Sequence, residues 1–383
     1  MLMMLVILSQ NGKNQNQMSK TMIKRYRLFL LIFIFFLPIL SFTPRLGLGH
    51  DLSTNLTSSF NPYFNKTKAY ELIEDQVQFG PRIPGSGAIE KTRQMIENKA
   101  VIDGMWEIEY QNFSKEWIEG ENVSLVNMII SPTIQNPNQS YFLLLAHYDS
   151  RKWADQDPNP ALRKNPVMGA NDGASGVAVA LELGRVLLLK HQISNFKIIL
   201  FDAEDQGSIG WNWLVGSRYF VNSNLFQKDK ITYAILFDMV GGNNALFKRE
   251  GYSDQYARSL VSEIWNIADK MNYAQFFINK SWSKITDDHL PFLEKGVPAV
   301  DIIDDFINNY KAWHTTSDTL SQISTETLKA VGQTTESFLL IVQQNTDSFF
   351  PLPSFTFQTA VSTWIIILSL LAVAFIKLYH KNS

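Results

Sequence analysis

The sequence predicts an α/β fold in which a mixed, mostly parallel sheet is covered by helices on both faces. Short apolar segments alternate with longer segments of helical periodicity through the middle of the chain, which is typical of such sheets. With 383 residues, 45% hydrophobic and 18% charged, the chain can bury one large core. Several apolar segments end abruptly in acidic residues or histidine, as expected where parallel strands end at a crevice.

Charge and cysteine content restrict the classes of function. The formal net charge is -2 and there is no basic stripe, which argues against a nucleic acid as the main partner. The chain has no cysteine, so it forms neither disulfides nor thiolate metal sites. Any metal ion must therefore be held by histidine and carboxylate groups.

Residues 1–43 are expected to act as a signal peptide or an uncleaved signal anchor. The apolar stretch Leu28–Leu40 follows four positive charges and ends in a polar segment near Ser41, which is the pattern of such signals. A buried core helix is the alternative, and the positive charges disfavour it. Residues 44–65, whose second half is rich in Ser, Thr and Asn, are expected to link this segment to a globular domain at residues 66–348.

A second apolar stretch, Thr359–Ile376, follows a short linker at residues 349–358. It is uncharged and long enough for a transmembrane helix. The lysines of the tail 377–383 predict that this tail is cytoplasmic. The globular domain is then extracytoplasmic, in the lumen of the secretory pathway or at the cell exterior, and the C-terminal helix tethers it to the membrane.

The elements of the globular domain follow from helical periodicity, alternation and apolar runs. The first helix has apolar residues at Tyr70, Ile73 and Val77, and Gly80-Pro81 ends it. A polar loop at Trp153–Pro166 is expected at the surface, on the rim of the crevice. Further helices are expected at Ile89–Ala100, Gly173–Lys190, Trp213–Phe220, Asp254–Met271 and Glu326–Gln343. Strands are expected at Trp106–Phe113 and Val123–Ile130, which form a hairpin, and at Tyr141–Ala146, Phe196–Phe201, Ile231–Phe237 and Ala299–Ile303.

The stretch Leu143–Asp149 is the first candidate for a site, because an apolar strand ends there in His-Tyr-Asp. His147 and Asp149 are two residues apart, so they point to the same face of a strand. An aspartate beside an imidazole fixes its tautomer and raises its basicity, which is common behind metal ligands. A purely structural histidine is the alternative.

Polar residues follow the other predicted strands at the same edge of the sheet. Each has an ordinary structural reading, such as a helix N-cap for Asp172 or a turn residue for Asp205. Their joint placement favours a site for a hard cation. The residues are Asp172, Glu204, Asp205, Asp238, Asp287-Asp288-His289 and Trp313-His314. Histidines and carboxylates without thiolates suit zinc with an open coordination position, and adjacent Glu204 and Asp205 can divide the roles of base and ligand.

A set of motifs occurs in order over about Tyr70–Gln344. They are His147-Tyr-Asp149, Asn171-Asp172-Gly173-Ala-Ser-Gly, Asp202-Ala-Glu204-Asp205 and Trp313-His314-Thr-Thr-Ser-Asp318. These motifs resemble the zinc-dependent aminopeptidase family that also contains the glutaminyl cyclases. The resemblance implies a phosphorylase/hydrolase-like fold of the zinc exopeptidase type, a catalytic domain at residues 66–348, and peptide or protein N-termini as substrates.

The resemblance to the dinuclear aminopeptidases of this family implies two zinc ions bridged by Asp172. His147 and Asp205 would complete one zinc site, and Asp238 and His314 the other. Such an enzyme removes N-terminal residues from peptides, with Glu204 as the base in either branch of the family.

Other segments resemble the glutaminyl-peptide cyclotransferases, which form N-terminal pyroglutamate and release ammonia. These segments are Asp287-Asp-His-Leu-Pro-Phe-Leu with a following Gly-Val-Pro, the Trp directly before His314, and Trp211 upstream of Gly216-Ser-Arg. This branch implies one zinc ion, held by Asp172, Asp205 and His314. Asp205 departs from the animal cyclases, which carry Glu at this position.

The same branch implies roles for the remaining candidates. His147 and Asp238 would stay in place without binding zinc, Asp287 would form a hydrogen-bonded acid network with Asp238, and Trp211 and Trp313 would wall the substrate pocket. The cyclase is favoured by these segments, and the aminopeptidase stays open because every dinuclear ligand is present. A catalytically inactive binding ectodomain is the third possibility, against which the intact base and ligand set argue.

Overall fold

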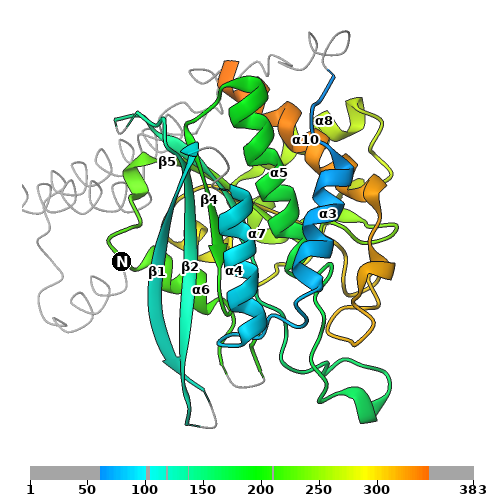
Figure 1. Cartoon of the computed structure of the whole chain (residues 1–383). Coiled ribbons are helices and arrows are strands. Elements are labelled where there is room, and N and C mark those ends of the chain that lie inside the picture. Colours follow the sequence, from blue (N-terminus) through cyan, green and yellow to red (C-terminus); the bar gives the residue numbers. More distant parts are fainter. Residues whose placement is uncertain (1–60, 101–103, 118–119, 137, 209–210, 345–383) are drawn as a thin grey trace, which may run out of the picture. The chain divides into compact units, whose positions relative to one another are not determined.

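The computed structural model describes residues 61–100, 104–117, 120–136, 138–208 and 211–344, which form an α/β domain around a six-stranded sheet (Figure 1). The predicted signal segment at residues 1–43 and the predicted membrane span Thr359–Ile376 lie outside these residues. Among the helices of the described ranges, none combines the length and the apolar character needed to cross a membrane.

The sheet is mixed and mostly parallel, as predicted. Its spatial order is β1-β2-β4-β3-β5-β8, and its strands are β1 (Trp106–Glu116), β2 (Asn122–Pro132), β3 (Tyr141–His147), β4 (Phe196–Phe201), β5 (Ile231–Asp238) and β8 (Ala299–Ile303). β1 and β2 form the predicted antiparallel hairpin, and β2 also pairs antiparallel with β4. β4, β3, β5 and β8 are parallel to one another, so their carboxyl ends meet at one edge.

Helices cover both faces of the sheet. On one face lies α5 (Ala174–His191), whose Gly176 comes so close to β5 that a Cβ there would lie 2.1 Å from the carbonyl oxygen of Phe237. α3 (Lys66–Val77) packs beside α5 on this side of the molecule (Figure 1). On the other face, α6 (Val215–Val221) and α9 (Leu290–Glu294) bury Phe220 and Phe292 in a cluster with alternate residues of the strands. The prediction of a covered sheet is therefore confirmed.

The prediction of one continuous helix at Asp254–Met271 is wrong. This segment forms two helices, α7 (Gly251–Tyr256) and α8 (Arg258–Lys270), because the backbone of Ala257 leaves the helical region with φ -131° and ψ 33°. The carboxylate of Glu250 caps α7 by accepting the amide hydrogens of Tyr252 and Ser253, and Arg249 pairs with Asp254. These contacts anchor α7 separately from α8.

Some elements were not predicted. β6 (Phe247–Arg249) and β7 (Phe277–Ser281) form a small second sheet, and they are too short to give a periodic signal. The remaining helical elements are α4 (Gly87–Ala100), α10 (Thr325–Gln344) and the short turns η3 (Pro160–Leu162), η4 (Lys228–Lys230) and η5 (Leu320–Gln322).

The end of the predicted linker belongs to the domain. The backbone amides of Tyr63 and Phe64 donate to the carboxylate of Glu336 on α10 at 2.9 and 2.8 Å. The ring of Phe64 is buried against Gly332. Residues before the predicted boundary at Lys66 therefore pack on the domain.

Candidate metal centre

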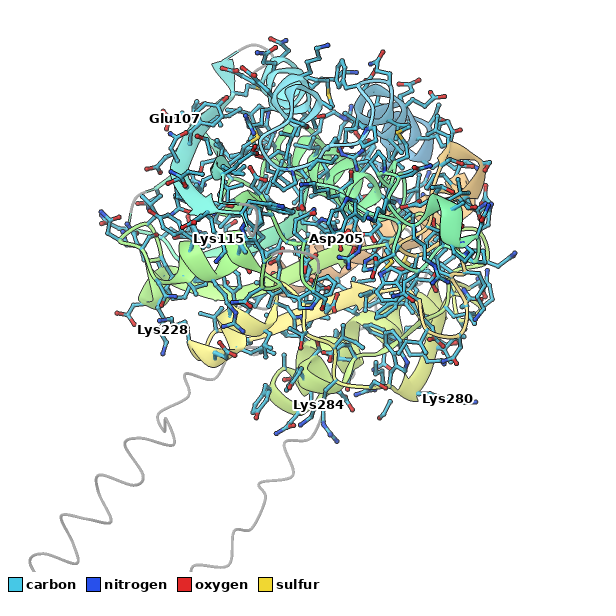
Figure 2. All side chains as sticks on the ribbon, turned by 90° about the horizontal axis from the view of Figure 1, so that it is seen from below. Glu107, Lys115, Asp205, Lys228, Lys280 and Lys284 are labelled. Carbon is cyan, nitrogen blue, oxygen red and sulfur yellow. The ribbon has the colours of Figure 1, made fainter. Side chains whose placement is uncertain are left out.

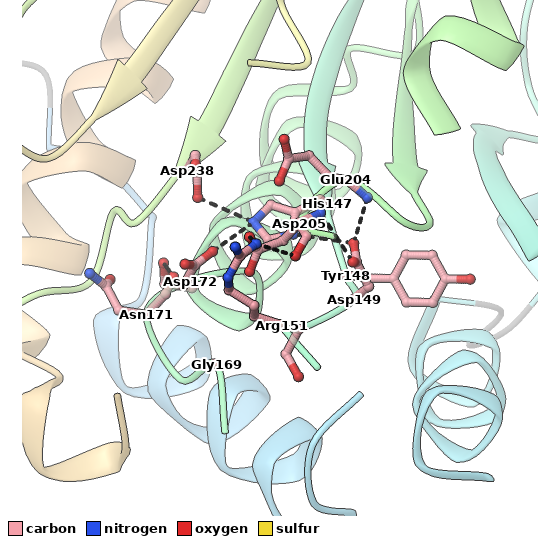
Figure 3. Close-up of polar contacts among 12 residues, drawn as sticks. His147, Tyr148, Asp149, Arg151, Gly169, Asn171, Asp172, Glu204, Asp205 and Asp238 are labelled. Atoms are coloured by element: carbon pink, nitrogen blue, oxygen red, sulfur yellow. Dashed lines mark hydrogen bonds and ion pairs between the residues drawn. The ribbon is translucent and has the colours of Figure 1, made fainter. Parts of the chain in front are cut away.

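The carboxyl edge of the sheet brings the predicted ligands together in two groups that share Asp172. Figure 3 shows His147, Asp172, Asp205 and Asp238 of these groups. In the first group, Nε2 of His147 lies 3.2 Å from Oδ1 of Asp172 and 3.3 Å from Oδ1 of Asp238. In the second, Nε2 of His314 lies 3.0 Å from Oδ1 of Asp205 and 3.7 Å from Oδ2 of Asp172. All of these side chains are buried.

The second group has the chemistry expected of a zinc site. Oδ2 of Asp172 and Oδ2 of Asp205 are buried without a hydrogen-bond partner among the described residues, which is costly unless a cation neutralises them. Burial lowers the pKa of His314 to about 3, so its imidazole stays neutral, which is the form that binds a metal. Burial raises the pKa of Asp205 to about 7, and a bound cation would reverse that shift.

The pairing of histidines and aspartates differs from the expected dinuclear arrangement. His147 was expected to share a site with Asp205, and Asp238 with His314. Instead His147 meets Asp238 because their strands, β3 and β5, are neighbours in the sheet. Asp205 lies beyond the end of β4, where a left-handed turn at Ala203 (φ 57°) directs the chain toward His314.

Asp149 holds this turn in place, in addition to its predicted contact with His147. Its carboxylate accepts the backbone amide hydrogens of Glu204 and Asp205 at 3.0 and 3.2 Å, and a side-chain hydrogen of Gln206 at 3.0 Å. Its Oδ1 lies 3.4 Å from Nδ1 of His147. Although burial alone lowers the pKa of His147, contacts with Asp149 and the other aspartates raise that pKa well above its usual value. The carboxylate of Asp149 therefore orients both the turn that carries Glu204 and Asp205 and the imidazole of His147.

Asp318 supports the loop that carries Asp172. Its carboxylate accepts the backbone amide hydrogens of Asn171 and Asp172 at 2.9 and 3.1 Å and the hydroxyl of Tyr310 at 2.7 Å. The fully buried Arg82 donates to the carbonyl oxygens of three residues around this loop, which are Tyr148, Met168 and Gly169. Sequence reasoning missed Arg82, since it follows a Gly-Pro pair that reads only as a helix end.

Arg151 is a second arginine that the sequence did not single out. Its Nη1 donates to the backbone carbonyl and to Oδ1 of Asp205, at 3.0 and 3.2 Å, and its Nε donates to Asp155 at 2.6 Å. Asp155 belongs to the loop predicted at the rim of the crevice. In the same loop, the amide of Gln156 donates to the backbone carbonyl of His314 at 3.2 Å. The loop and Arg151 therefore fix both Asp205 and His314.

Glu204 lies in the same cavity as the second group. Burial raises the pKa of Glu204 well above its usual value, and the negative charges of Asp287 and Asp288 add to that effect, whereas His147 opposes it. Burial also raises the pKa of Asp287 to about 7, with the charge of Asp238 as the next cause. The charge of Asp238 therefore opposes the ionisation of Asp287 across the cavity. The hydrogen-bonded acid network between these two residues stays a prediction.

A third group of possible ligands lies behind Asp287. Asp287, His289 and Asp301 bring ligand atoms close together, and all three are buried. Nε2 of His289 lies 3.1 Å from Oε2 of Glu250, and its Nδ1 lies 3.7 Å from Oδ2 of Asp301. Because α7 carries the cap Glu250, this group ties Asp287 to α7 and β8.

The cavity has a volume of about 240 Å³ and aromatic walls. Trp313 stacks on His314, with ring centroids 3.8 Å apart, and Trp213 lies nearly parallel to the same imidazole at 5.9 Å. Phe306 adds a ring against Trp313 at 4.6 Å. The imidazole of His314 therefore lies between indole rings, which restrict its rotation and exclude water.

Trp211 does not have the predicted position in the pocket wall. It packs edge-on against Trp117 at 4.3 Å, and its Nε1 donates to the carbonyl oxygen of Glu116 at 2.6 Å. Trp213 takes the expected role. Its ring lies on Gly207, where a Cβ would be only 2.1 Å from the indole. The indole of Trp213 can take this place in the pocket wall only because residue 207 is a glycine. The positions of the tryptophans in the sequence do not reveal this requirement.

Comparisons with known proteins agree with this geometry. Residues 127–339 match the model of peptidase family M28. The glutaminyl-peptide cyclotransferase of Gloydius blomhoffii is 26% identical over 297 residues, which cover 68% of this chain and 77% of that protein. Aminopeptidase YwaD of Bacillus subtilis is 29% identical over 211 residues, which cover 52% of this chain and 40% of that protein. The crystal structure of Porphyromonas gingivalis glutaminyl cyclase superposes with a TM-score of 0.67 at 34% identity, covering 72% of this chain and 98% of that chain.

Proposed function

Since this chain belongs to peptidase family M28, we propose that it is a zinc-dependent glutaminyl-peptide cyclotransferase, which converts an N-terminal glutaminyl residue to pyroglutamyl and releases ammonia. The observation that carries the proposal is the distribution of unsatisfied carboxylate oxygens. Those of Asp172 and Asp205 both belong to the group around His314. In each group the histidine Nε2 already contacts a carboxylate oxygen, but only the group around His314 also has an orphaned buried oxygen on both of its aspartates. This favours one metal ion, as in the cyclase reading.

The chemistry of the proposed reaction needs one metal and one base. Zinc held by Asp172, Asp205 and His314 would supply a Lewis acid that polarises the side-chain carbonyl of the substrate glutamine. The substrate's own neutral α-amine attacks the carbon of that carbonyl, so neither a water molecule nor an enzyme nucleophile is consumed. Holding amine and carbonyl together in a closed cavity accounts for much of the rate.

Glu204 is placed to move the proton. Its carboxylate accepts the proton that the amine loses when the C–N bond forms, and returns it to the departing nitrogen, which leaves as ammonia. A carboxylate with a raised pKa is a stronger base than an ordinary one, and burial raises the pKa of Glu204. Asp287 and Asp238, of which one stays protonated, support the developing charge by hydrogen bonding.

An aminopeptidase is the second candidate. Asp172 is shared by both ligand groups, and each group brings its ligand atoms within 4.8 Å of one another, so a second metal has a possible place beside His147. The similarity to aminopeptidase YwaD points the same way. With two zinc ions, the same base would direct a water molecule to the first peptide bond.

Two peptides distinguish these functions. We expect a peptide that begins Gln-Ala to lose the mass of ammonia, and one that begins Leu-Ala to stay intact, with both products measured by mass spectrometry. Free leucine from the second peptide, with no pyroglutamate from the first, would assign the chain to the aminopeptidases. If a zinc-loaded, folded protein forms neither product, the remaining hypothesis is a catalytically inactive binding ectodomain.

The aromatic walls give a test of the pocket. Trp213→Ala should lower kcat/KM for a Gln-Ala peptide about tenfold, because the loss of a ring contact with substrate and His314 removes about 1.5 kcal/mol. Trp313→Ala should act in the same direction. Trp211→Phe is the matched control, since it changes an indole outside the cavity and should leave kcat/KM unchanged. Equal losses in all three variants would indicate a folding effect and remove the specific role of Trp213.

A further inference from the structure

We propose that a groove beside the catalytic cavity binds the residues that follow the N-terminal residue of the substrate, and that it favours acidic side chains there. The proposal rests on the proposed function for the identity of the first residue only. The groove has a volume of about 330 Å³ and is formed by residues 113–115 of β1 and by residues 212–222, which include α6. Apart from Trp213, none of these residues is used in the cyclisation chemistry.

The groove and the cavity share one lining residue. Trp213 lines both, with its ring beside His314 on the cavity side. An enzyme that acts on a peptide N-terminus must let the rest of the chain leave the cavity. A peptide that passes over Trp213 enters the groove directly, so its second to fifth residues would lie between β1 and α6.

Two aromatic rings line the groove, and one of them is exposed. Phe113 of β1 and Tyr219 of α6 stack with ring centroids 4.2 Å apart and an angle of 10° between their planes. Tyr219 is 45% exposed, whereas Phe113 is partly buried against the cluster that includes Trp117. The exposed ring of Tyr219 offers an apolar surface for peptide backbone and side chains.

The charged groups on the groove are positive. Arg218 pairs with Glu294 at 2.9 Å, so part of its charge is offset. Lys115 forms no hydrogen bond or ion pair with the residues that the structure describes, and it lies on the same face of β1 as Phe113. Its neighbour Glu116 points to the opposite face of the strand. Lys115 is therefore available to an acidic side chain of the substrate.

The test compares peptides that differ only in downstream charge. The peptides are Gln-Ala-Asp-Asp-Ala, Gln-Ala-Ala-Ala-Ala, Gln-Ala-Lys-Lys-Ala and the dipeptide Gln-Ala, each assayed by ammonia release from the zinc-loaded full chain. At low salt we expect the acidic peptide to have a kcat/KM about two- to fivefold above the neutral one, as for exposed ion pairs. The preference should vanish near 1 M salt, where charges are screened within about 3 Å.

Lys115→Glu should reverse this preference and leave the Gln-Ala dipeptide unaffected. Lys280→Glu makes the same charge change and should keep the wild-type preference, since Lys280 and Lys115 lie on opposite sides of Asp205 (Figure 2). Retention of the wild-type preference in Lys115→Glu overturns the proposal, even though Gln-Ala is still cyclised. Absence of pyroglutamate from every peptide overturns the proposed function instead. If Lys115→Glu does not fold, Lys115→Gln and the salt dependence of the wild type decide the matter.

Discussion

Glu204→Gln should abolish pyroglutamate formation, with a loss of about 10²- to 10⁴-fold in kcat, while zinc binding is retained. The amide has the size of the carboxylate but cannot accept the proton of the substrate amine. It also leaves the ligand group of Asp172, Asp205 and His314 unchanged. Ammonia release from a Gln-Ala peptide measures the effect, and metal analysis of the same sample measures zinc.

The matched control for Glu204→Gln is Asp287→Asn. Asp287 also lines the cavity, and it is assigned the support of developing charge rather than the transfer of the proton. Its replacement should therefore lower kcat less than that of Glu204. If Glu204→Gln keeps more than a tenth of the wild-type activity with full zinc, the base is a different group.

His314→Ala should remove both zinc and activity. The purified wild-type protein should contain about one zinc per chain in the cyclase reading and about two in the aminopeptidase reading. Loss of His314 takes away the only neutral nitrogen ligand of the second group. His147→Ala is the control, because His147 belongs only to the first group and is expected to leave one zinc in place.

The metal content of these two variants separates the hypotheses directly. If His314→Ala loses its zinc and His147→Ala keeps one zinc per chain, the result supports the single-zinc site. A drop from about two zinc ions to about one in both variants supports the dinuclear site. Wild-type protein that binds no zinc under conditions where it is folded contradicts both enzymatic readings.

The fold was predictable because its signals are local. Burial of a single strand explains the apolar run before His147, and burial of a single helix explains the apolar spacing after Asp172. Parallel strands then bring their carboxyl ends to one edge of the sheet, whatever lies between them in the sequence. For the same reason the set of polar residues at that edge could be named in advance.

The partners within that set could not be named, because they depend on strand order and on single backbone angles. His147 meets Asp238 only because β3 lies next to β5, and Asp205 reaches His314 only through the left-handed turn at Ala203. Trp211 and Trp213 differ by two positions, and it is Gly207 that decides which of them reaches the cavity. Nothing in the residues next to Arg82 in the sequence indicates that it supports the loop of Asp172.

The course of the outermost helices decides how the catalytic cavity is presented. α10 starts beside Gly241 at the carboxyl edge, where the amide of Ser324 donates to that residue's carbonyl, and it ends where Gln343 contacts Asn195 at the start of β4. α3 starts near Glu336, close to the end of α10, and runs toward Ala174. The polypeptide thus enters and leaves the described domain at the amino edge of the sheet, opposite the cavity. Both ends of the described domain therefore lie on the side of the sheet away from the entrance that substrate N-termini would use.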